Sequence, residues 1–144
     1  MKAVVRTSLA LVAGILLTFL VIIVMEQFIT WLFPSPHIGD LSDPAVAQQF
    51  MQQLPVIALL LVLLGWLLSI TVGFWSAALI AGKSRGRFAL AIGAAVLLGC
   101  VANFLQLPHP LWFVVVTCLL VPAITWLNWW IARRYFIWKR WSRA

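Results

Sequence analysis

The stretch PVIALLLVLLGWLLSITVGFWSAALIA, residues 55–81, contains no charged side chain. A helix needs ~20 mostly apolar residues to cross ~30 Å of hydrocarbon, and this stretch is longer than that. Three further stretches are also long and apolar enough, and prolines or basic turns separate them. The predicted spans are residues 8–33, 55–81, 88–107 and 111–131. The sequence therefore predicts an all-α membrane protein whose four transmembrane helices form one antiparallel bundle.

The overall composition supports a membrane location. Hydrophobic residues make up 65% and charged residues 9% of the 144 residues, a balance that excludes an ordinary soluble domain. The net charge of +7 would indicate nucleic-acid binding in a soluble protein, but here the bilayer is the expected partner. Lys and Arg flank the spans at positions 2–6, 83–87 and 133–143, whereas residues 34–54 and 108–110 contain none. By the positive-inside rule, we expect a bacterial inner membrane, cytoplasmic termini and a cytoplasmic basic tail at 132–144.

A short helix is expected in the first connection between spans. Ser42-Asp43-Pro44 combines an N-cap residue with a proline at the first helical position. From residue 44 to residue 54, apolar residues then recur every four positions among glutamines. The pattern predicts an interfacial helix on the periplasmic side, lying over the bundle.

Small residues recur every four positions in the second and third spans. Such stripes let helix backbones approach closely, and in lipid this packing, and not a hydrophobic drive, holds helices together. The stripes have three alternative roles: packing within the chain, forming a homo-oligomer interface, or binding another membrane protein. The residues are Gly65, Ser69, Gly73, Ala77 and Ala81 in the second span, and Ala91, Ala95 and Gly99 in the third.

Two tryptophans are followed by two arginines at the end of the fourth span. Trp129 with Arg133 and Trp130 with Arg134 are i, i+4 pairs that can form cation–π contacts, and Trp138 follows them. Amphipathic rings and cations suit the headgroup level of an anionic leaflet. The pattern predicts a lipid anchor, with recognition of a specific lipid headgroup as the alternative.

Of the three acidic residues in the sequence, only Glu26 falls inside a predicted span. An ionisable group at that depth is a candidate functional residue. At 1.5 Å per residue it lies ~10 Å inside the end of its span, nearer the interface than the midplane. Gln27, Thr30 and Asn103 are candidate hydrogen-bonding partners. The group is either a structural polar contact or the coupling carboxylate of a transporter.

His37 and His109 both fall on the predicted periplasmic side, so the topology allows them to meet around a metal or haem. Their spacing matches no known ligand signature, and turn histidines beside prolines commonly have structural roles. We therefore predict no cofactor. Cys100 and Cys118 are interpreted as small apolar thiols within spans.

Catalytic motifs are missing from the sequence. Residues 77–84, AALIAGKS, fit a loosened phosphate-loop pattern, but they end a membrane helix instead of joining a strand to a helix. The sequence contains no H-E-x-x-H or C-x-x-C motif, and no Ser-His-Asp set or carboxylate pair is recognisable in it. These patterns favour a non-enzymatic protein.

Several short motifs resemble a group of small bacterial four-span membrane proteins that have no assigned activity. The motifs are Glu26, Phe33-Pro34, Ser42-Asp43-Pro44, Gly65-Trp66, Asn103 and residues 108–112, PHPLW. The resemblance implies fold and topology only. Members of that group often carry a histidine four residues after the glutamate, where this chain has Thr30, which weakens a Glu–His site here. Four spans with a glutamate in the first also resemble the plan of small multidrug exporters, as an analogy of architecture.

Together these observations predict an accessory or interaction subunit that packs through the small-residue faces. The alternative is a small oligomeric transporter or channel that uses Glu26. The third hypothesis is a metal or haem protein that uses His37 and His109.

Overall fold

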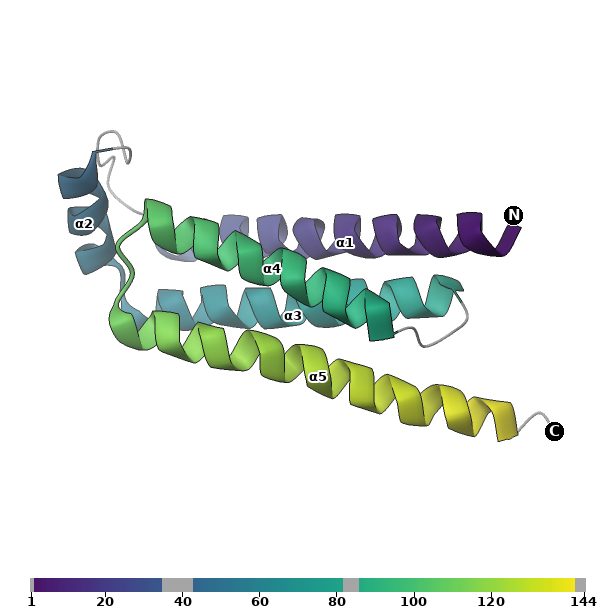
Figure 1. Ribbon diagram of the computed structural model, residues 1–144. Coiled ribbons are helices and arrows are strands. Elements are labelled where there is room, and N and C mark those ends of the chain that lie inside the picture. Colours follow the sequence, from purple (N-terminus) through teal and green to yellow (C-terminus); the bar gives the residue numbers. More distant parts are fainter. Residues whose placement is uncertain (1, 35–42, 82–85, 142–144) are drawn as a thin grey trace.

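The computed structural model describes residues 2–34, 43–81 and 86–141, with side chains at 4–34, 43–81 and 87–135. Regular structure in these ranges is entirely helical (Figure 1). The helices are α1 (Lys2–Leu32), α2 (Pro44–Gln53), α3 (Val56–Ala81), α4 (Gly86–Gln106) and α5 (Leu111–Trp141).

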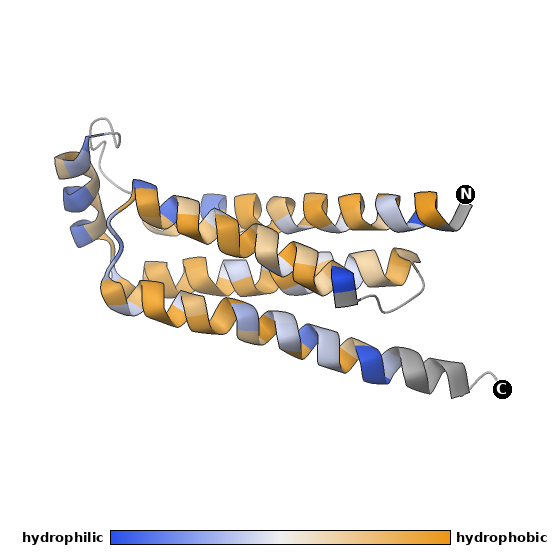
Figure 2. Cartoon of the chain, in the orientation of Figure 1, coloured by the Kyte–Doolittle hydropathy of each residue, from blue (hydrophilic) through white to orange (hydrophobic). Residues whose placement is uncertain are grey.

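Four of the helices are long and apolar enough to cross a membrane, over Val4–Leu32, Val56–Ala81, Arg87–Gln106 and Leu111–Tyr135. Hydrophobic residues predominate along most of their length (Figure 2). The predicted all-α fold with four membrane-spanning helices is confirmed, and the chain is a multi-pass membrane protein.

Two helices extend more than two residues beyond the predicted spans. α1 begins at Lys2 instead of residue 8, and α5 continues to Trp141 instead of ending at residue 131. A helix can extend beyond the hydrocarbon because its backbone hydrogen bonds are made within the helix itself. The hydropathy pattern marks where the lipid ends, and the helix itself runs further.

α2 begins as the sequence predicts. The Asp43 side chain accepts a hydrogen bond from the backbone nitrogen of Ala45 at 2.9 Å, and Pro44 occupies the first helical turn. α2 lies across one end of the bundle, transverse to the long helices (Figure 1). Met51 of α2 is buried and belongs to the same hydrophobic cluster as Leu59 and Trp66 of α3. We call this end of the molecule the α2 end.

α3 is the central helix of the bundle. It packs most extensively on α1 and also contacts α4 and α5, whereas α1 and α5 have no backbone contact in the described ranges. The opposite end of the bundle, where α1 begins and α5 ends, carries Arg6, Arg87, Arg133 and Arg134 (Figure 1). We call it the basic end. There the Nε atom of Arg6 donates a 2.8 Å hydrogen bond to the carbonyl oxygen of Ile80, in the last turn of α3.

Candidate functional site

Glu26 lies on an exposed face of α1, about 9 Å along the axis from the last residue, Leu32. Gln27 and Thr30 are also exposed, and the Thr30 hydroxyl donates to the backbone carbonyl of Glu26 at 2.9 Å instead of to its carboxylate. Asn103 is half-buried on α4. Within the described side chains, no hydrogen bond joins the Glu26 carboxylate to any of these three residues.

His109 lies in an aromatic cluster at the α2 end. Its ring stacks on Phe113, with centroids 5.3 Å apart, and meets Phe104 edge-on at 5.1 Å. The Nδ1 atom lies 2.8 Å from the Leu107 carbonyl oxygen and therefore donates the proton. Burial lowers the pKa of His109, and the hydrogen bond to Leu107 opposes that shift. These contacts make His109 a neutral packing residue of the turn.

The hypothesis of a metal or haem site depends on His37, which lies outside the described residues, so it stays a prediction. Among the side chains at 4–34, 43–81 and 87–135, no group of three or more His, Cys, Asp or Glu residues is placed to hold a metal ion. Cys100 is buried and Cys118 is exposed, and both are free thiols.

The small residues of α3 lie against α1. Gly65 faces Met25, and Gly73 faces both Gly14 and Thr18. Ser69 and Ala77 are fully buried, and Ala81 is half-buried at the end of the helix. The α3 face is therefore covered within the chain, and side chains larger than hydrogen at its glycines would push α1 away.

The small residues of α4 are placed differently. Ala91 and Ala95 are half-buried and Gly99 is exposed, and a Cβ atom built on Gly99 would have no atom within 4 Å. Gly93, on another face of α4, makes the close contact instead: a Cβ atom there would collide with Thr125 of α5. We call Ala91, Ala95 and Gly99 the open face of α4.

Both predicted aromatic–basic pairs occur in α5. The guanidinium of Arg133 lies 4.8 Å from the Trp129 ring centroid, and that of Arg134 lies 4.3 Å from the Trp130 ring. Trp138 is within α5, at a position whose side chain lies outside the described part. The cations are held at the basic end, on the faces of amphipathic rings.

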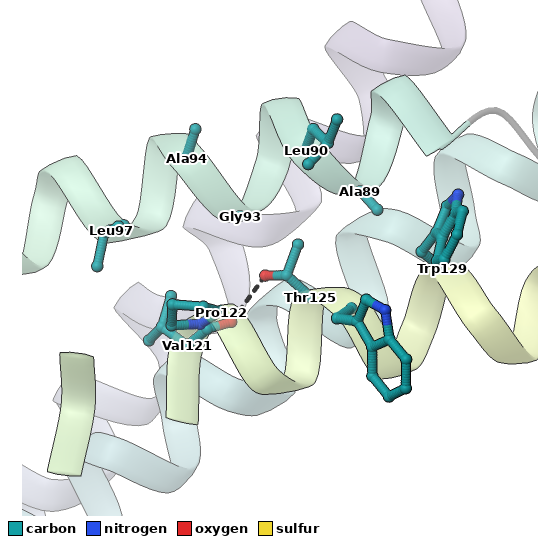
Figure 3. Close-up of a pocket in the computed structure, with 10 residues that line it drawn as sticks. Ala89, Leu90, Gly93, Ala94, Leu97, Val121, Pro122, Thr125 and Trp129 are labelled. Carbon is teal, nitrogen blue, oxygen red and sulfur yellow. Dashed lines mark hydrogen bonds between the residues drawn. The ribbon is translucent and has the colours of Figure 1, made fainter. Parts of the chain in front are cut away.

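A groove of about 490 Å³ opens between α4 and α5 (Figure 3). Apart from Gly93 and Thr125, the residues that line it have apolar side chains. The Thr125 hydroxyl donates to the Val121 carbonyl at 2.7 Å. Its edges include Leu90 and Trp126, which are 68% and 59% exposed, so the groove faces the surrounding lipid. This groove was not predicted from the sequence, although the small pair Ala89 and Gly93 marks where α4 and α5 come close.

A polar network between α3 and α5 was also missed. Asn128 is buried; its carbonyl oxygen accepts from the indole nitrogen of Trp75 at 3.0 Å. Its amide nitrogen donates to the Thr71 hydroxyl at 3.1 Å and to the Ile124 carbonyl at 3.0 Å. The sequence feature that could have revealed this network is an amide side chain inside an apolar span, the same feature that made Asn103 a candidate.

Comparison with known protein families, with curated proteins and with solved structures finds no match to this chain.

Proposed function

We propose that this membrane protein is a non-enzymatic accessory subunit that binds a helix of another membrane protein on the open face of α4. The supporting observation is the contrast between the two small-residue stripes. The α3 stripe is covered by α1, whereas Gly99 in the α4 stripe has open space before it. A transmembrane helix with small residues of its own fits such a face, because close backbone approach maximises van der Waals contact in lipid.

The basic end faces the cytoplasm of a bacterial inner membrane in this proposal. Arg6, Arg87, Arg133 and Arg134 gather at that end, whereas Glu26 and Asp43 lie toward the α2 end. α2 would then be periplasmic. A reporter enzyme fused after Ala144 should be active in the cytoplasm, and a periplasmic signal would reverse the assignment.

The docking proposal is tested by native mass analysis of protein extracted gently from its own membranes. We expect a second, unrelated membrane protein in fixed stoichiometry. Gly99→Leu and Ala95→Leu should each release it, because the larger side chain keeps the partner's backbone away. Ala123→Leu, at an exposed position of α5, is the matched control and should retain it. Equal retention in all three variants would overturn the proposal.

A second candidate function, transport, rests on Glu26. A carboxylate inside a span without a hydrogen-bonding partner among the described side chains is available to bind a proton or cation. This function is proposed for an oligomer, in which the pathway lies between copies of the chain. A homodimer without other chains, and loss of transport in Glu26→Gln with assembly intact, would favour transport over the accessory role.

A further inference from the structure

We infer that the groove between α4 and α5 binds one anionic phospholipid, with an acyl chain in the groove and the phosphate beside Arg133 and Arg87 at the basic end. The inference does not rest on the proposed function, because the groove and the open face of α4 are different faces of that helix.

The position of the groove matches one leaflet. It extends over residues 89–97 of α4 and 121–129 of α5, about 12 Å at 1.5 Å per residue. Half of the ~30 Å hydrocarbon core is only slightly more than this length. Because α4 crosses the membrane from Arg87, the groove begins just inside the headgroup level and runs toward the midplane. Its volume of about 490 Å³ lies within the range of roughly 300–1,000 Å³ found for ligand sites.

The walls of the groove favour a hydrocarbon chain over a polar ligand. Leu90, Leu97 and Val121 are aliphatic, and Trp126 and Trp129 provide flat ring faces. The Thr125 hydroxyl already donates its proton to the helix backbone, so it offers a ligand no free donor. A soluble metabolite would lose its hydration in this groove without replacement hydrogen bonds, whereas an acyl chain loses none.

The charges at the mouth of the groove select the headgroup. Arg133 lies over Trp129, which lines the groove, and Arg87 stands two residues before the lining residue Ala89. The acidic residues that the structure describes, Glu26 and Asp43, lie toward the other end of the bundle. A lipid phosphate here meets two cations and no nearby carboxylate, and arginine matches phosphate by bidentate hydrogen bonding.

The second aromatic–basic pair provides a matched control. Arg134 lies over Trp130 in the same way that Arg133 lies over Trp129, but Trp130 does not line the groove. A general attraction of the basic end for an anionic leaflet would depend equally on both arginines. Binding in the groove depends on Arg133 and not on Arg134.

The test is native mass analysis of the full chain, titrated with an equimolar mixture of phosphatidylglycerol and phosphatidylcholine that carry the same acyl chains. We expect one phosphatidylglycerol to be retained in preference. Arg133→Gln should lower the preference about five-fold, the contribution of one interfacial cation, whereas Arg134→Gln should leave it unchanged. Ala94→Phe, which places a ring in the groove from an exposed position, should lower retention of both lipids about ten-fold.

Two controls guard against a general loss of structure. Ala123→Phe makes the same change at an exposed position of α5 outside the groove and should retain lipid like the parent chain. Leu90→Trp fills the groove from a second exposed position and should repeat the effect of Ala94→Phe. Equal retention of the two lipids by the parent chain, equal effects of Arg133→Gln and Arg134→Gln, or full retention by both groove-filling variants would overturn the inference.

Discussion

Gly14 of α1 and Gly73 of α3 meet backbone to backbone where the two helices pack. A methyl group built on Gly14 would lie 2.7 Å from the carbonyl oxygen of Gly73 and 2.8 Å from the Cβ atom of Ala77. The Thr18 hydroxyl turns back to the Gly14 carbonyl at 2.8 Å, so its polar atom is satisfied within α1. The contact depends on the absence of side chains at two positions, one in each helix.

Gly14→Ala should therefore destabilise the bundle. The added methyl group has backbone on one side and Ala77 on the other, neither of which can rotate away. We expect a loss of about 1–3 kcal/mol in the free energy of unfolding, the usual cost of overpacking. The measurement is equilibrium unfolding in mixed detergent micelles. Gly99→Ala makes the same change where nothing lies within 4 Å, and should be neutral or slightly stabilising. Equal losses in the two variants would contradict this account.

The hydrogen bonds of Asn128 should couple α5 to α3. Trp75→Phe removes the indole donor while keeping an aromatic ring, and Asn128→Ala removes the acceptor. Hydrogen bonds between membrane helices contribute ~0.6 kcal/mol on average, with a maximum of ~1.7 kcal/mol. A double-mutant cycle on these two residues should give a coupling energy in that range. Additive losses would show that the 3.0 Å contact contributes no coupling.

The protonation of His109 should make stability depend on pH. Burial lowers its pKa below the usual value of 6.5, so the fold prefers the neutral imidazole. The contribution of neutral His109 to the free energy of unfolding is fully present above pH 6.5. It is lost as the pH falls through 6.5 and then through the lower pKa of the folded state. Unfolding measured from about pH 8 to about pH 5 should show this decline. The His109→Phe variant should show a smaller decline, and an identical pH dependence in both proteins would refute the assignment.

Phe113 should be the aromatic residue most sensitive to truncation. It is fully buried, and its ring centroid lies 5.7 Å from that of Trp66, 6.1 Å from that of Phe104 and 5.3 Å from that of His109. In soluble cores, Phe→Ala costs ~3–5 kcal/mol. We expect a smaller loss here, because the unfolded side chain reaches lipid instead of water and only the packing is lost. Phe19→Ala, at a residue 50% exposed on α1, should change the unfolding free energy little. A similar loss at both sites would argue against a packing origin.

The spans could be predicted because hydrocarbon imposes a minimum length on apolar runs, and the start of α2 because Asp43 and Pro44 act locally. Which face of each span packs against another helix could not be predicted. In a helix that is apolar on all sides, hydrophobic periodicity no longer separates the buried side from the lipid side. The stripe through Gly73 contacts α1, whereas an equally regular stripe through Gly99 contacts nothing within 4 Å of that glycine.

The polar residues show the same limit of sequence reasoning. Glu26 and Asn103 stood out because they interrupt apolar spans. Within the described side chains, however, no hydrogen bond joins the Glu26 carboxylate to the Asn103 amide. Asn128 interrupts a span just as plainly and is held by Trp75 and Thr71, which lie more than fifty residues earlier in the chain. Such a partner is set by how the helices face each other, which the residue pattern within one span does not reveal.

The order in which α3 meets its neighbours bears on biosynthesis. Everything that Gly14, Thr18 and Met25 pack against in α3 has been synthesised by residue 81, before α4 and α5 exist. Since α1 has no backbone contact with α5 in the described ranges, its main interface, which is with α3, is complete by residue 81. The α1–α3 pair can therefore assemble in the bilayer while the ribosome is still translating, and the later helices add to a template that is already built.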